Sequence, residues 1–178
     1  MKTYKMTIAG LERELPICEV NEHLDIAAFV MFSDVEMTVN AARELLKKAP
    51  EHYVILTAES KGIPLAYEMA KQEGKNYVLA RKSAKLYMTN PIEVKVKSIT
   101  TAKVQSLFID ELDKQKLDGK RVLIVDDVIS TGESLAALEA LVAHTNATIV
   151  GKMAVLAEGD AAERHDIIYL EKLPLFFK

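Results

Sequence analysis

The 178-residue sequence has one cysteine, no tryptophan and no long apolar run. Cys18 alone can form neither an intrachain disulfide nor a multi-cysteine zinc site. No stretch approaches the roughly 20 apolar residues that span a bilayer, and the first residues alternate instead of forming the apolar segment of a signal peptide. Charge of one sign is also scarce, because 23 basic and 26 acidic residues leave a net charge of −3. This balance argues against an extended nucleic-acid-binding surface. We therefore expect a cytoplasmic single-domain protein that binds neither membrane nor nucleic acid.

Short apolar runs alternate with helical patterns along most of the chain. Helices are expected after Ser33, which is a candidate N-cap, from Gly62 to Glu73 and from Glu133 to His144. Buried strands are expected at 53–56, 77–80, 122–125 and 147–156. This alternation predicts an α/β fold with a parallel sheet covered on both faces.

The remaining segments have other patterns. Residues 4–20 predict a hairpin or extended region, and 92–97 and 104–109 predict a protruding hairpin around a polar turn at 98–103. A charged turn is expected from there to Gly119, and a short terminal segment after residue 156.

The stretch from 122 to 134 is the most informative in the sequence. An apolar strand is followed by Asp126 and Asp127, then by a loop rich in hydroxyls, and then by a helix start. Backbone N–H groups at a helix N-terminus favour an anion, and Gly132 lets a ligand approach the backbone. A phosphate therefore suits the loop, whereas the carboxylates suit ribose hydroxyls or a divalent cation. The alternative is that this stretch binds no ligand: the loop hydroxyls would only cap the helix, and Asp126 and Asp127 would be solvated acids. We favour a phosphorylated ribose as the ligand.

This stretch resembles the 5-phosphoribosyl-1-pyrophosphate (PRPP) signature of the type I phosphoribosyltransferases. Residues 57–62, Thr-Ala-Glu-Ser-Lys-Gly, look like the family's pyrophosphate loop. Residues 81–86 resemble the Arg-Lys-x-x-Lys-Leu run of the purine enzymes, particularly adenine phosphoribosyltransferase. The three segments occur in the family's order, and the resemblance covers about residues 50–156.

The resemblance implies a type I phosphoribosyltransferase fold: a central, mostly parallel sheet flanked by helices. A small hood would comprise about 1–35 and 157–178, the core about 36–156, and a mobile hairpin about 87–106. The implied reaction is transfer of a 5-phosphoribosyl group from PRPP to a purine base, with adenine favoured, and release of pyrophosphate. Magnesium bound with PRPP and a homodimeric assembly are implied in the same way.

The resemblance also implies roles for individual residues. Asp126 and Asp127 would hold the ribose, and either could ligate magnesium, while Lys61 and Arg81 would stabilise the departing pyrophosphate. Phe32, in a segment similar to Val-Phe-Arg-Asp of the adenine enzymes, would stack on the base, with plain core packing as the alternative. Glu158 would accept a purine N–H or else face solvent. The other candidate substrate-binding residues are Glu59, Ser60, Lys82, Lys85, Val128, Ile129, Ser130, Thr131, Gly132, Glu133 and Ser134.

Two departures from the family pattern keep alternatives open. Residues 98–103 lack the acid and the tyrosine of the adenine enzymes' mobile loop, and Glu133 stands where a second glycine is usual. The alternatives are a PRPP-binding regulatory protein of the same fold and a xanthine or guanine phosphoribosyltransferase. The hairpin-like first element and the net charge of −3 favour an enzyme over a nucleic-acid-binding regulator.

Overall fold

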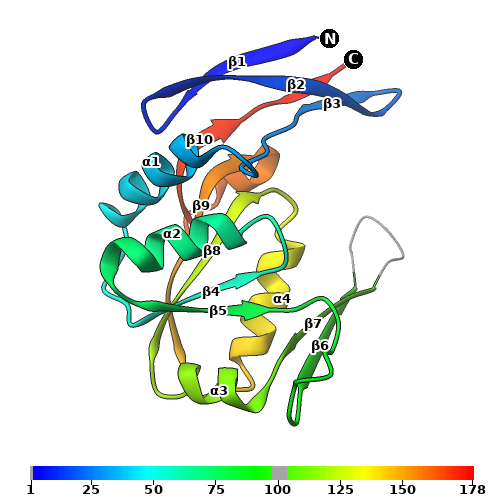
Figure 1. Cartoon of the computed structure of the whole chain (residues 1–178). Coiled ribbons are helices and arrows are strands. Elements are labelled where there is room, and N and C mark those ends of the chain that lie inside the picture. The colour runs from blue at the N-terminus through cyan, green and yellow to red at the C-terminus, as the bar shows by residue number, and fades with distance from the viewer. Residues whose placement is uncertain (1, 98–103) are drawn as a thin grey trace.

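A parallel five-stranded sheet forms the centre of the computed structural model, which describes residues 2–97 and 104–178 (Figure 1). Its strand order is β10-β9-β8-β4-β5, and every neighbouring pair is parallel. The predicted parallel α/β sheet is therefore confirmed. The strands are β4 (Val54–Ala58), β5 (Asn76–Ala80), β8 (Arg121–Ile129), β9 (Thr148–Glu158) and β10 (Ile168–Leu173).

Helices cover both faces of this sheet. On one side α1 (Val35–Leu46) and α2 (Ile63–Glu73) pack over Ile55 and Leu123, and on the other side α4 (Glu133–Val142) packs over Leu56 and Ile124. Successive strand residues point to opposite faces, so a strand between two helical layers must be apolar at every position. This requirement explains the short continuous apolar runs of the sequence.

A second, antiparallel sheet of order β1-β2-β3-β11 lies beyond α1 and contains both ends of the described chain (Figure 1). Its strands are β1 (Thr3–Ile8), β2 (Leu11–Asn21), β3 (Leu24–Ala27) and β11 (Leu175–Phe177). Ala9 and Gly10 both have positive φ, which suits a tight hairpin turn. The terminal segment is longer than a short tail: after the 3₁₀ turn η1 (Gly159–Glu163), β10 joins the central sheet and only β11 joins the small one.

The predicted hairpin is present as β6 (Ile92–Lys97) paired antiparallel with β7 (Val104–Ile109). The predicted turn at 98–103 lies outside the described residues. The hairpin is not free of the body, because Val94, Leu107 and Ile109 are buried in the same core as α4. A backbone pairing between Arg81 and Phe108 also joins it to the end of β5.

Three local expectations were wrong. Asp34, not Ser33, caps α1: its carboxylate accepts a hydrogen bond from Met37 N at 3.0 Å, while Ser33 adopts a left-handed φ of 68°. The expected charged turn before Gly119 contains α3 (Glu111–Leu117), which has a single buried residue and therefore no apolar stripe for sequence analysis to detect. The strand expected at 122–125 extends to Ile129, so the two acids lie within it.

Asp34 links α1 to the small sheet. Its carboxylate also accepts hydrogen bonds from Arg13 Nε (2.7 Å) and Nη2 (3.1 Å) on β2. The hydrogen bond from Arg13 holds the pKa of Asp34 below its ordinary value. This carboxylate therefore contributes stability above its unfolded pKa of 3.8 that is lost as the pH falls.

Replacement of this carboxylate tests the link. We expect Asp34→Ala to lower the free energy of unfolding at pH 7.5 by about 1–2 kcal/mol, because both the cap and the ion pair are lost. Asp34→Asn keeps a capping oxygen and should lose less. Urea denaturation measures both, and equal losses would contradict the capping role.

Candidate functional site

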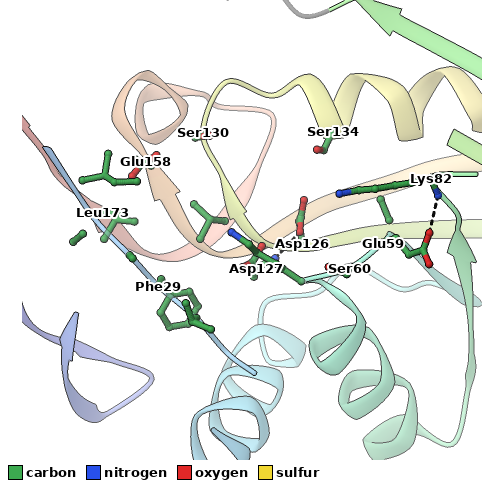
Figure 2. Close-up of a pocket in the computed structure, with 17 residues that line it drawn as sticks. Phe29, Glu59, Ser60, Lys82, Asp126, Asp127, Ser130, Ser134, Glu158 and Leu173 are labelled. Carbon is green, nitrogen blue, oxygen red and sulfur yellow. Dashed lines mark hydrogen bonds between the residues drawn. The ribbon is translucent and has the colours of Figure 1, made fainter. Parts of the chain in front are cut away.

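A cavity of about 420 Å³ lies at the carboxyl ends of β4, β8 and β9 (Figure 2). A smaller hollow of about 40 Å³ adjoins it inside the loop that leads into α4. The large cavity is lined by many of the predicted site residues: Glu59, Ser60, Lys61, Lys82, Asp126, Asp127, Val128, Ser130, Ser134 and Glu158. The hollow adds Ile129, Thr131, Gly132 and Glu133. Parallel strands gather their carboxyl ends at one sheet edge, which is why loops far apart in the sequence meet here.

The acid pair forms the floor of the cavity. Asp126 is paired with Ala154 of β9 in the strand register, and its Oδ1 accepts a hydrogen bond from Asp127 N at 2.8 Å. Burial, reinforced by the neighbouring Asp127 carboxylate, raises the pKa of Asp126 to about 8, against the opposing charge of Lys61. Asp127 Oδ2 and Thr57 Oγ1 are buried without a hydrogen-bond partner among the described residues. Such groups are costly unless a ligand satisfies them.

Gly62 lets the loop after β4 lie directly on the acid pair. A Cβ atom at this position would stand 2.3 Å from Thr57 Oγ1 and 3.2 Å from Asp126 Oδ1, so no side chain fits. The loop therefore holds its preceding residue, Lys61, within electrostatic reach of Asp126. The predicted basic loop and the predicted acid pair form one site.

The anion loop at residues 130–134 turns into α4 at Gly132, which has a left-handed φ of 79°. Sequence analysis missed Arg164, whose Nη1 would lie 2.8 Å from a Cβ atom at Gly132. Its Nε and Nη2 donate to Asp166, which also accepts a hydrogen bond from Lys152. Asp166 thus holds Arg164 against a loop that lies far from it in the sequence, so no local motif marks this contact.

Glu59 connects two loops. Its Oε1 accepts from Arg81 Nε and its Oε2 from Lys82 N, both at 2.7 Å. Burial opposes ionisation, but these two hydrogen bonds keep the pKa of Glu59 below its ordinary value. Both carboxylate oxygens are thus used within the protein, so the structure supports a positioning role rather than direct substrate binding.

Two predicted cations do not line the cavity. Arg81 is directed to Glu59 and to Tyr87, whose hydroxyl accepts from Arg81 Nη1 at 2.7 Å. Lys85 Nζ donates to Ser83 Oγ. Among the described residues, Lys61 and Lys82 are the lysines that face the cavity. The sequence spacing of Arg81 and Lys85 could not show this, because Glu59 comes from another loop.

Phe32 does not line the cavity either. It is 46% exposed and lies in a groove with Val35 and Tyr67 between α1 and α2. The apolar side of the cavity is formed instead by Phe29, Val30 and Leu173, together with Ile26, Ala27, Ala28 and Ala58 (Figure 2). Phe29, three positions earlier in the chain, is the phenylalanine that lines the cavity.

Glu158 is at the end of β9 and lines the cavity beside Leu173, its register partner on β10 (Figure 2). Its partial burial raises its pKa, whereas the charge of Lys61 lowers it. The oxygens of a carboxyl group in this position can accept a hydrogen bond from an N–H group of a heterocyclic ligand.

A parallel sheet with an acid pair and a hydroxyl-rich loop at its carboxyl edge is an arrangement that suits a phosphorylated sugar. The family model for the phosphoribosyl transferase domain matches residues 33–173, and the chain belongs to this family. The type I fold expected from the sequence is confirmed.

Curated relatives and a solved structure agree with this assignment. The chain is 33% identical over 126 residues to an adenine phosphoribosyltransferase of Rhodococcus jostii, covering 71% of this chain and 69% of that protein. It is 33% identical over 110 residues to a hypoxanthine/guanine phosphoribosyltransferase of Methanohalophilus mahii, covering 62% and 54%. The crystal structure of adenine phosphoribosyltransferase from Thermoanaerobacter pseudethanolicus superposes with a TM-score of 0.68 at 23% identity, covering 80% of this chain and 84% of that one, and shows the shared fold. No helix in the described part of the chain has the length and apolar character needed to cross a membrane.

The buried acid should reduce the stability of the folded protein. An unfolded chain loses the Asp126 proton near pH 3.8 and the folded chain near pH 8, so stability falls as the pH rises between these values. We expect Asp126→Asn to raise the free energy of unfolding at pH 7.5 by about 1–3 kcal/mol, because the amide still accepts the hydrogen bond from Asp127 and carries no charge. The gain should vanish below pH 4. Denaturation at both pH values measures this, with the exposed Asp160→Asn as control; unchanged or lower stability at pH 7.5 would refute the expectation.

A methyl group at Gly132 should disturb the anion loop. Gly10 has the same φ of 79° but open space around its Cβ position, so Gly10→Ala is a matched control for backbone strain. We expect Gly132→Ala to cost about 1 kcal/mol more than the control, because Arg164 must also move. The variant should also bind PRPP more weakly, as measured by isothermal titration calorimetry. Equal stability losses, with PRPP affinity unchanged, would contradict the contact.

Proposed function

We propose that this protein transfers a 5-phosphoribosyl group from PRPP to a purine base, preferentially adenine, with release of pyrophosphate. The observation that carries the proposal is the convergence, in one cavity, of the acid pair, the anion loop and Lys61. Membership of the phosphoribosyl transferase family supports the PRPP substrate. The relative named adenine phosphoribosyltransferase supports the base.

The anion loop would hold the 5′-phosphate. Its backbone N–H groups lie at the N-terminus of α4, and Ser130, Thr131 and Ser134 add hydroxyl donors. Asp126 and Asp127 would accept hydrogen bonds from the ribose hydroxyls, which gives the unpaired Asp127 Oδ2 a partner. Binding the sugar at both ends orients its anomeric carbon for reaction.

The reaction breaks the bond between the anomeric carbon and pyrophosphate. A base nitrogen forms the new bond to that carbon and loses its proton to pyrophosphate or water. Positive charge develops on the ribose, near the acid pair, while negative charge develops on the leaving group. Lys61 and Lys82 face the cavity and would stabilise pyrophosphate. Magnesium bound with PRPP would neutralise diphosphate charge, and a carboxylate of the acid pair would suit it as a ligand in addition to the substrate's oxygens.

The apolar side of the cavity suits a flat base. Phe29, Val30 and Leu173 offer apolar contact surface, and Glu158 would accept an N–H of the ring or of an exocyclic amine. Adenine presents such an amine. Phe32, which lies outside the cavity, has no part in this proposal.

The family resemblance supports four further proposals. The small sheet would act as the hood over the base, and the β6–β7 hairpin as the lid that excludes water during transfer. The chain would act as a homodimer in the cytoplasm. Light scattering with size-exclusion chromatography tests the assembly.

A base panel tests the function. The protein is incubated with PRPP, Mg²⁺ and adenine, hypoxanthine, guanine or xanthine, and pyrophosphate release is followed. We expect turnover with adenine to be fastest, and Asp127→Asn to lower kcat/KM by about 100-fold or more, because ribose positioning is lost.

The controls distinguish the alternatives. Asp160→Asn, an exposed acid just beyond β9, should keep wild-type activity. Fastest turnover with guanine or xanthine would favour the alternative transferase. No turnover with any base, together with a rise in melting temperature on addition of PRPP, would overturn the enzyme and favour the PRPP-binding regulator.

A further inference from the structure

A second cavity, of about 380 Å³, lies at the amino ends of β4 and β5, at the sheet edge opposite the catalytic cavity. It is lined by Tyr53, Val54, Gly74, Lys75, Asn76, Lys116 and Lys120. We propose that this cavity is a separate binding site for a nucleoside phosphate. The proposal does not depend on catalysis, because it concerns binding to residues that the transferase site does not use.

The two cavities are separated by the length of the sheet. Val54 lines the second cavity and Ala58, four residues along β4, lines the catalytic one. An extended strand rises about 3.3 Å per residue, so the two rims are about 13 Å apart. The lining residues of the two cavities do not overlap. A ligand in the second cavity would therefore leave the acid pair and the anion loop untouched.

The charge of the second cavity is positive. Three of its lining residues are lysines, and none of the described residues that line it carries a carboxylate. Lys75 is held by His52 O (2.8 Å) and Glu73 (3.2 Å), and Lys116 by Asp113 (3.0 Å). The partners of these two lysines lie outside the cavity lining. They hold the ammonium groups of Lys75 and Lys116 in place, and Glu73 and Asp113 partly neutralise their charge.

Lys120 supplies the remaining charge. Its Nζ lies 4.4 Å from the centre of the Tyr53 ring, and no carboxylate of the described residues lies within ion-pair distance of it. A cation over an aromatic face is stabilised by the ring, but a nearby phosphate can still reach its N–H donors. Lys120 is therefore the ammonium best placed to bind an anion.

The shape of the cavity favours more than a bare phosphate. Its volume lies within the range of about 300–1,000 Å³ typical of small-molecule sites. Tyr53 is 62% exposed and offers a flat apolar surface, and Asn76 adds a carboxamide that can both donate and accept hydrogen bonds. An aromatic ring and a carboxamide beside three ammonium groups suit a base joined to phosphates. A free phosphate would use only the lysines.

Lysine acetylation read by mass spectrometry tests the proposal residue by residue. Full-length protein is treated with acetic anhydride alone, with ATP, with adenosine, or with inorganic tripolyphosphate at matched ionic strength. We expect ATP at 1 mM to reduce acetylation of Lys120 and Lys116 about threefold or more. Lys114, on the same helix as Lys116 but paired with Asp118 outside the cavity, is the internal control and should be unaffected. Adenosine and tripolyphosphate should each protect less than ATP.

Variants separate this site from the catalytic one. Lys120→Gln should raise the ATP concentration needed to protect Lys116 about tenfold, since one charged contact is lost. The matched Lys114→Gln should leave that concentration unchanged. Tyr53→Leu removes the aromatic ring without changing the charge. It should weaken the protection of Lys116 and Lys120 by ATP more than their protection by tripolyphosphate. All three variants should keep transferase activity.

Three results would overturn the proposal. One is no protection of Lys120 and Lys116 at 10 mM ATP, and another is equal protection of Lys114. The third is tripolyphosphate protecting as well as ATP, which would show a polyanion patch without base recognition. Loss of transferase activity with adenine in the wild-type protein would bear on the proposed function alone.

Discussion

The continuation of β8 beyond its apolar run into two acids is the constraint on which the rest of the site depends. Leu123 and Ile124 are buried against opposite helical layers, and β4 and β9 hold the strand on either side. Asp126 is thus still hydrogen-bonded in the sheet, as its pairing with Ala154 shows. Its burial and the charge of Asp127 raise its pKa, and the loop after β4 must supply Gly62 and Lys61 around it.

Charge in this protein is organised locally, and its small net value conceals the pattern. Lys61 and Lys82 face the catalytic cavity together with the acid pair, so opposite charges line one hollow. Glu59 neutralises Arg81 and binds the backbone of Lys82, which orders the basic loop without adding a cation to the cavity. Lysines with no acidic neighbour in the lining are found at the other edge of the sheet. The two ends of the sheet therefore differ in charge: both acids and lysines line the cavity at the carboxyl end, whereas the charged residues that line the cavity at the amino end are lysines.

Sequence patterns predicted the parts of the fold that depend on neighbours along the chain. The helix from Gly62 to Glu73 has its glycine boundaries and period within one segment, and the strand runs are apolar because they are buried on both faces. Contacts between distant segments were not predictable in this way. The partner of Arg81 depends on the adjacency of two loops, and the place of Arg164 depends on its approach to Gly132 from a distant part of the sequence. The weak amphipathicity of α3 concealed that helix in a similar manner.

The small sheet is composed of strands from both ends of the described chain, and β11 is its last member. Lys178 pairs there with Glu19 and Asp25 of β2 and β3. During synthesis β1, β2 and β3 emerge well before β11, so the edge of β3 lacks its partner until the strands of the central sheet have been made. The growing chain would thus pass through a stage in which the acid pair and the loop at residues 130–134 have been made while the edge of β3 is still unpaired and open to association with other chains.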